Sequence, residues 1–134
     1  MSTKSWFSDD YQEARNRFLD AIEELKELEF EVIQEQLPLN LKGPKGEDLI
    51  IDLAAIGSLE SKNLMLYSSG IHGVEGFAGS AIQLSVLDKI KKQHPFSDYC
   101  IIFIHIINPY GMAWHRRVNE NNVDLNRNFL TNHE

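Results

Sequence analysis

The sequence predicts an α/β fold in which a mixed β-sheet is flanked by helices. Three features lead to this prediction: an amphipathic helix near the N-terminus, a hairpin of two strands, and a strand–helix–strand unit with a glycine-rich first turn. A chain of 134 residues suffices for one hydrophobic core, so residues 1–134 are expected to form a single domain. With 43% hydrophobic and 25% charged residues, the composition is that of an ordinary globular protein.

The first helix is expected to begin near residues 8–10, where hydroxyl and carboxylate groups can accept hydrogen bonds from free amides. Apolar residues then recur every three or four positions on one face: Ala14, Phe18, Ile22, Leu25 and Leu28. The pattern becomes alternating over residues 29–41. A turn-rich segment at 43–48 separates it from an apolar run at 49–56, which predicts a β-hairpin.

A strand–helix–strand unit is expected after the hairpin. Residues 63–68 predict a short buried strand, and the glycine-rich segment 69–76 leads into a helix from about Phe77 to Gln93. The helix is expected to bury one face formed by Ala78, Ala81, Ile82, Val86 and Ile90. The run from Tyr99 to Ile107 suits a strand buried on both sides. Such a unit crosses over with a right hand, so its two strands are parallel.

Charge and hydropathy exclude several functions. The net charge of -7, without a cluster of lysines, argues against binding to nucleic acid or to an anionic membrane. The single cysteine, Cys100, lies in an apolar run and is expected to be a buried, inert thiol. No apolar secretory segment opens the chain, and the apolar run at 100–107 is too short to span a membrane. We therefore expect a cytoplasmic protein.

Two candidate metal ligands follow the first strand of the strand–helix–strand unit. His72 and Glu75 lie three residues apart in a tight turn, so an imidazole and a carboxylate can reach one cation. A nitrogen and an oxygen ligand suit zinc, and the surrounding glycines allow the turn to fold sharply. A solvated turn is the alternative, because a histidine and a glutamate at this spacing also occur by chance.

A second polar cluster follows the last strand. It contains Arg116, Arg117 and Arg127 in an otherwise acidic chain. Ligands of open α/β sheets bind at the carboxyl ends of strands, and arginine pairs well with carboxylates. The alternative is a solvated loop in which Glu120 and Asp124 neutralise the arginines.

Four motifs together resemble the zinc carboxypeptidase superfamily, which includes aspartoacylase-like and succinylglutamate desuccinylase-like relatives. In chain order they are His72 with Glu75, Asn108-Pro109, Arg117, and the run Asn126-Arg127-Asn128-Phe129. The segment 69–77 is similar to a bacterial branch of this superfamily known as a domain of unknown function. The resemblance covers roughly Leu49 to Phe129. It implies the N-terminal half of a zinc carboxypeptidase-like (phosphorylase/hydrolase-like) fold.

The resemblance also implies roles for individual residues. His72 and Glu75 would be two of the three protein ligands of a catalytic zinc ion. Arg117, or alternatively Arg116, would polarise the scissile carbonyl and stabilise its oxyanion.

Asn126 and Arg127 would bind the free carboxylate of the substrate, a small peptide or an N-acyl amino acid. These roles describe a zinc-dependent, metallocarboxypeptidase-like hydrolase that cleaves an amide bond next to a free carboxylate. The alternatives are an N-acyl amino acid deacylase and a non-catalytic fragment that binds a carboxylate or a partner chain.

The superfamily also requires a third zinc ligand, a histidine, and a glutamate base, both well downstream of the Asn-Arg pair. His133 lies too close to Arg127 for this ligand position, and His94 and His105 suit helix-end and core roles. His115 is the one stand-in. We therefore expect a truncated domain with weak zinc binding and negligible turnover on its own. An unpaired sheet edge would then favour association into a homo-oligomer.

Overall fold

Four strands form one mixed sheet in the computed structural model, which describes residues 5–93 and 98–128. The elements in chain order are α1 (Tyr11–Glu27), β1 (Val32–Lys42), β2 (Asp48–Ile56), β3 (Asn63–Ser68), the 3₁₀ turn η1 (Gly73–Glu75), α2 (Gly76–Gln93), β4 (Tyr99–His105) and α3 (Pro109–Ala113). The strand order is β1-β2-β4-β3, with β3 and β4 parallel and the other pairs antiparallel. The predicted α/β class, with a mixed sheet and flanking helices, is confirmed.

Helix α1 begins where the sequence predicts. The side chain of Asp10, its N-cap, accepts a hydrogen bond from the amide of Glu13 at 2.8 Å. The predicted apolar face is buried through Leu25, whereas Leu28 forms the C-cap and is exposed.

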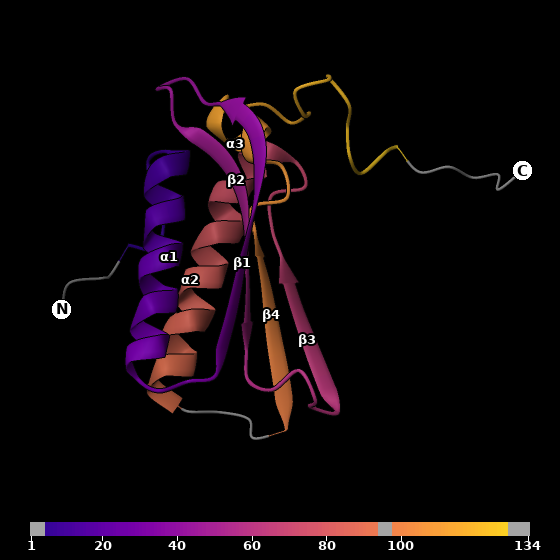
Figure 1. The fold of residues 1–134 in the computed structure, drawn as a ribbon. Coiled ribbons are helices and arrows are strands. Elements are labelled where there is room, and N and C mark those ends of the chain that lie inside the picture. Colours follow the sequence, from indigo (N-terminus) through magenta and orange to yellow (C-terminus); the bar gives the residue numbers. More distant parts are fainter. Residues whose placement is uncertain (1–4, 94–97, 129–134) are drawn as a thin grey trace, which may run out of the picture.

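Helices α1 and α2 lie side by side against the same face of the sheet (Figure 1). The core between the two layers contains Phe18 and Ile22 from α1, Leu87 from α2, and Phe103 from β4, all fully buried. Because α1 and α2 both lie on this side, no helix among the described residues covers the other face of the sheet.

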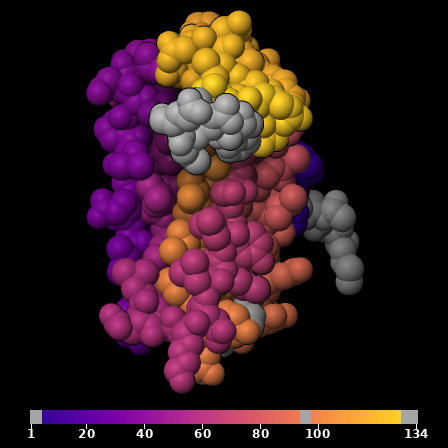
Figure 2. Space-filling view, turned by 90° about the vertical axis from the view of Figure 1, so that its right-hand side faces the viewer, coloured from indigo at the N-terminus to yellow at the C-terminus, as the bar shows by residue number. Residues whose placement is uncertain are grey.

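The helix-free face of the sheet is apolar. It exposes four large side chains from the two edge strands: Ile33, Leu37, Leu64 and Leu66. Figure 2 looks toward this side of the molecule, with the segment coloured yellow above the strands. The prediction that residues 63–68 form a buried strand is therefore wrong: β3 is an edge strand, and Leu64 is 62% exposed. Strand β4 is buried on the helix side, and on the other side Cys100 is buried but Ile102 and Ile104 are only half-buried. The prediction of a strand buried on both sides is therefore correct only in part.

The two edges of the sheet differ in how they are protected. On β1, Pro38 and an irregular register between Pro38 and Lys42 interrupt regular pairing. On β3, the residues from Leu64 to Ser68 carry no charge and no proline. Association of two chains through the β3 edge stays a prediction.

A buried ion pair connects α1 to the middle of the sheet. Asp52 on β2 is fully buried and receives two hydrogen bonds from Arg15, from Nε at 2.7 Å and from Nη2 at 3.0 Å. Gln36 on β1 donates a third hydrogen bond to Asp52 at 2.9 Å. The pair thus fixes α1 against the sheet.

Among the described residues, no helix is both long enough and apolar enough to cross a membrane.

Candidate functional site

His72 and Glu75 lie at the carboxyl end of β3, where the chain turns from the sheet into α2. Gly70 adopts a positive φ of 69° in this turn, a conformation that favours glycine. Residues 73–75 form the single 3₁₀ turn η1, with His72 as its N-cap. Side chains three residues apart are eclipsed in such a turn. His72 Nδ1 and Glu75 Oε2 consequently lie 3.2 Å apart, so the two side chains converge.

The imidazole of His72 lies between two carboxylates. Its Nε2 is 3.0 Å from Asp124 Oδ1, and its Nδ1 faces Glu75. A neutral imidazole carries one N–H, so it can donate to only one of these two carboxylates. In the tautomer that donates from Nε2 to Asp124, Nδ1 has a lone pair that faces the Glu75 carboxylate. A cation between Nδ1 and Glu75 would satisfy both groups in this tautomer.

The spacing of these two groups fits a zinc ion. Two ligand atoms each about 2.0–2.2 Å from a tetrahedral zinc lie about 3.4 Å apart. The distance of 3.2 Å between Nδ1 and Oε2 is close to this value. Glu75 is exposed, so a cation could enter from solvent. In the described part of the chain, however, no group of three His, Cys, Asp or Glu residues could hold a metal ion. Asp124 also lies beside His72, but it contacts the opposite ring nitrogen.

Asp124 also belongs to this site, although the sequence predicts it only as a residue that neutralises the arginines. Besides His72, it binds Arg117 Nε at 2.9 Å through Oδ2, and the amide of Asn126 at 2.9 Å through Oδ1. Desolvation raises the pKa of Asp124, but the hydrogen bonds from Arg117, Asn126 and His72 outweigh it and lower the pKa to about 2. Asp124 is therefore an acceptor at neutral pH. A carboxylate on the second nitrogen of a histidine is the usual outer partner of a metal-bound imidazole.

Backbone contacts hold the His72 turn against the segment after α3. The amides of Gly73 and Val74 donate to the carbonyls of Arg117 and Arg116, at 3.3 and 3.0 Å. A side chain at Gly73 would overlap the backbone of Gly111, so these segments pack at a distance that only glycine permits. The contact brings Arg117 to Glu75, with Nη1 3.6 Å from Oε1.

Asn108 anchors the start of this second segment. It is buried, its side chain caps α3 by accepting from the amide of Gly111 at 2.9 Å, and Pro109 follows as the first helical residue. Its Nδ2 also lies 3.5 Å from the carbonyl of Arg117. The Asn-Pro motif therefore has a structural role in placing Arg117.

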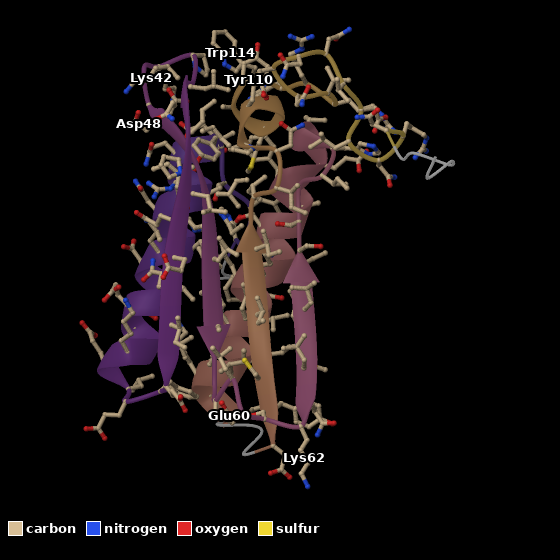
Figure 3. The ribbon with its side chains drawn as sticks, turned by 45° about the vertical axis from the view of Figure 1, so that its right-hand side comes forward. Lys42, Asp48, Glu60, Lys62, Tyr110 and Trp114 are labelled. Carbon is tan, nitrogen blue, oxygen red and sulfur yellow. The ribbon has the colours of Figure 1, made fainter. Side chains whose placement is uncertain are left out.

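The other predicted site residues lie further along the loop. Arg116 donates to Asn122 at 3.0 Å, and its guanidinium lies 6.0 Å from the centre of the Tyr110 ring. Arg127 is exposed and donates to the carbonyl of Asn126 at 2.8 Å. Figure 3 labels Tyr110 and Trp114 of this region, with Lys42 and Asp48 of the hairpin beside them. Trp114 Nε1 donates to the carbonyl of Lys42 at 3.3 Å, which connects the loop to the hairpin.

The other two histidines that the structure describes, His105 and His115, do not join His72. His105 is fully buried and stacks on Phe18. Its Nε2 shares a hydrogen bond of 2.9 Å with Ser80 Oγ. Desolvation lowers the pKa of His105 to about 3, so it is a neutral core residue. His115 is exposed and packs edge-on against Phe77. His94, His133 and Phe129 lie outside the described residues.

A cavity at the opposite end of the sheet does not belong to this site. It has a volume of about 360 Å³ and is lined by exposed polar residues of the loop between β2 and β3, together with Asp98. Figure 3 places Glu60 and Lys62 at that end, far from α3. The chemistry of His72, Glu75, Arg117 and Asp124 is therefore confined to the carboxyl ends of β3 and β4.

Comparison with one solved structure supports the fold. A protein from Shewanella denitrificans OS-217, described as a proposed carboxypeptidase A, shares 23% identity with a TM-score of 0.58 over 87% of this chain and 31% of its own. Glutaminyl cyclase from Porphyromonas gingivalis aligns with a TM-score of 0.41 at 14% identity, over 81% of this chain and 50% of its own. This chain thus spans about a third of the Shewanella protein and half of the cyclase.

Comparison with family models assigns the chain to a family. No curated protein matches the sequence significantly. A family model described as "Protein of unknown function (DUF2817)" matches residues 7–134, which is nearly the whole chain. The chain belongs to this family.

Proposed function

We propose that this chain carries the metal-binding and substrate-binding part of a zinc-dependent hydrolase that cleaves an amide bond next to a free carboxylate. The observation that carries the proposal is the arrangement around His72. Its Nδ1 and Glu75 Oε2 converge at the spacing of zinc ligands, while Asp124 holds Nε2. The fold shared with the proposed carboxypeptidase A agrees with this activity.

His72 and Glu75 would hold the zinc ion, which would lower the pKa of a bound water and polarise the scissile carbonyl. Asp124 fixes the tautomer and orientation of the His72 ring. Arg117 is half-exposed beside Glu75, where its guanidinium can donate to the oxyanion that develops on the carbonyl. Arg117 lies beside the proposed ligand Glu75, whereas the contacts of Arg116 are with Asn122 and Tyr110, so proximity to the site favours Arg117 for this role.

Asn126 and Arg127 are proposed to bind the substrate carboxylate. The exposed guanidinium of Arg127 offers two parallel donors to a carboxylate, and Asn126 is adjacent to it. Neither a third ligand nor a general base is found with His72 among the described residues. Zinc binding by this chain is therefore expected to be weak, and its turnover negligible.

Selective binding of a carboxylate tests the proposal. In the presence of zinc, the chain is expected to bind an N-acetyl amino acid at least about 10-fold more tightly than the corresponding carboxamide, since a hydrogen bond to a charged group is worth about 1.5–3 kcal/mol. Calorimetric titration of both ligands measures this ratio, and Arg127→Gln should abolish it.

Three further outcomes distinguish the proposed function from its alternatives, the non-catalytic fragment and the N-acyl amino acid deacylase. Equal binding of acid and amide would contradict the carboxylate clamp. Selective binding that zinc does not strengthen would favour the non-catalytic fragment, because the proposed hydrolase site binds its substrate beside the metal. Chelator-sensitive hydrolysis that is lost in His72→Ala would show a complete site, and a panel of peptides and N-acyl amino acids would then separate peptidase from deacylase activity.

A further inference from the structure

Arg117 occupies the position of a counter-ion in the candidate metal site. Its Nε donates to Asp124 Oδ2 at 2.9 Å, and its Nη1 lies 3.6 Å from Glu75 Oε1. The other oxygen of Glu75 faces His72 Nδ1 at 3.2 Å. Glu75 is therefore shared, with one oxygen toward the imidazole and the other toward the guanidinium.

The charges of this group make the contact between Arg117 and Glu75 dependent on a cation. Glu75 and Asp124 carry two negative charges, and Arg117 alone among these residues supplies a fixed positive charge. A divalent cation between His72 and Glu75 would neutralise Glu75 and repel the nearby guanidinium. The cation and Arg117 thus compete for the same carboxylate.

The structure allows the guanidinium to move while the segment that carries it stays fixed. The carbonyl of Arg117 accepts from the amide of Gly73, and it lies beside Asn108 Nδ2. The side chain is 49% exposed, and its closer contact is the one to Asp124. The contact of Nη1 with Glu75 is longer, at 3.6 Å, and Glu75 is itself exposed, so a small displacement of either group can separate them while Nε keeps its bond to Asp124.

We propose that Arg117 holds Glu75 in the metal-free protein and releases it when a divalent cation binds between His72 and Glu75. The released guanidinium then points its Nη donors at solvent and at an anionic ligand, so that metal binding and anion binding are coupled. This inference rests on the proposed metal site. It goes further in assigning Arg117 a second position that the cation controls.

The zinc affinity of two matched variants tests this exchange, in which zinc replaces Arg117 as the partner of Glu75. Arg117→Gln removes the competing charge and is expected to bind zinc about fivefold more tightly than the wild-type chain, the factor that corresponds to one partly exposed ion pair. Arg116→Gln removes the same charge one residue earlier, and its zinc affinity should stay within about twofold of wild type. Calorimetric titration with zinc chloride measures all three, and urea unfolding checks that each variant is folded.

Each other outcome contradicts one claim. Weaker zinc binding by Arg117→Gln would mean that Arg117 only orients Asp124 and His72, which overturns the exchange. An equal gain in both variants would indicate a general charge effect and would also overturn it. If wild-type protein binds no zinc, the proposed metal site itself fails.

The wild-type chain provides a readout that needs no variant. Zinc should shift the guanidinium ¹H–¹⁵N signals of Arg117 and leave those of Arg116 unchanged. Unchanged Arg117 signals at saturating zinc would contradict the proposed release, even if Arg117→Gln fails to fold.

Discussion

Replacing Asp52 with alanine is expected to lower the free energy of unfolding by about 3–5 kcal/mol, the usual cost of breaking a buried ion pair by removing one partner. Asp52 is fully buried, and Arg15 donates two hydrogen bonds to it while being only 13% exposed itself. Without the carboxylate, Arg15 and Gln36 lose their acceptor inside the protein. Urea unfolding followed by circular dichroism measures the change.

Asp48→Ala is the matched control for this prediction. Asp48 pairs with Lys42 at 2.6 Å, but both side chains are more than 60% exposed, so its loss should cost less than about 1 kcal/mol. Similar costs for the two variants would contradict the view that the Arg15–Asp52 pair holds α1 to the sheet.

Replacing Gly73 with alanine is expected to disrupt the candidate site. The added methyl group would overlap the backbone of Gly111, which cannot yield as a flexible side chain could. We expect a loss of stability of about 1–3 kcal/mol from overpacking. The turn at 73–75 should also move away from Arg117, because the hydrogen bond from Gly73 to the Arg117 carbonyl breaks. Zinc affinity should then fall by about 10-fold or more, as when an outer partner of a metal ligand is lost.

Gly46→Ala separates this effect from general strain. Gly46 lies in the hairpin turn with a φ of 83°, and nothing lies near the position of an added side chain. The substitution should cost about 1–2 kcal/mol of stability through its backbone conformation. It should leave zinc affinity unchanged. Unaltered zinc affinity in Gly73→Ala would show that the close packing at Gly111 does not position His72.

Most of the fold could be predicted because its elements have local signals. The acidic start of α1, the turn at 43–48 and the glycine-rich turn after β3 each mark an element within a few residues of its observed end. The parallel pairing of β3 and β4 is predicted by the single helix that connects them, because a strand–helix–strand unit returns the chain in the same direction.

The buried face of α2 is predicted correctly only in part. Ala81 and Ile90 are buried as expected, but Ile82 is 58% exposed, while Ser80 and Gln83 are buried. Gln83 donates to the carbonyls of Tyr67 and Ile104, both at 2.9 Å. Apolar periodicity does not reveal such polar partners, because they depend on strand ends that lie far away in the sequence.

The candidate site could be predicted in part for a similar reason. The spacing of three between His72 and Glu75 is a local feature, and the 3₁₀ turn brings both side chains together. The contact of Asp124 with His72 joins residues 52 positions apart, and no local pattern indicates it. The Asp at the start of the run Asp-Leu-Asn-Arg is the available signal, although the sequence alone favours it as a partner of the arginines.

The most direct test of the central claim is the ¹⁵N spectrum of the histidine side chains during a zinc titration. The chain has five histidines, and the His72→Gln variant identifies the signals of His72. We predict that zinc shifts Nδ1 of His72 while Nε2 keeps the proton that it donates to Asp124. Zinc that binds to other histidines and leaves Nδ1 of His72 unchanged would contradict the proposed metal site.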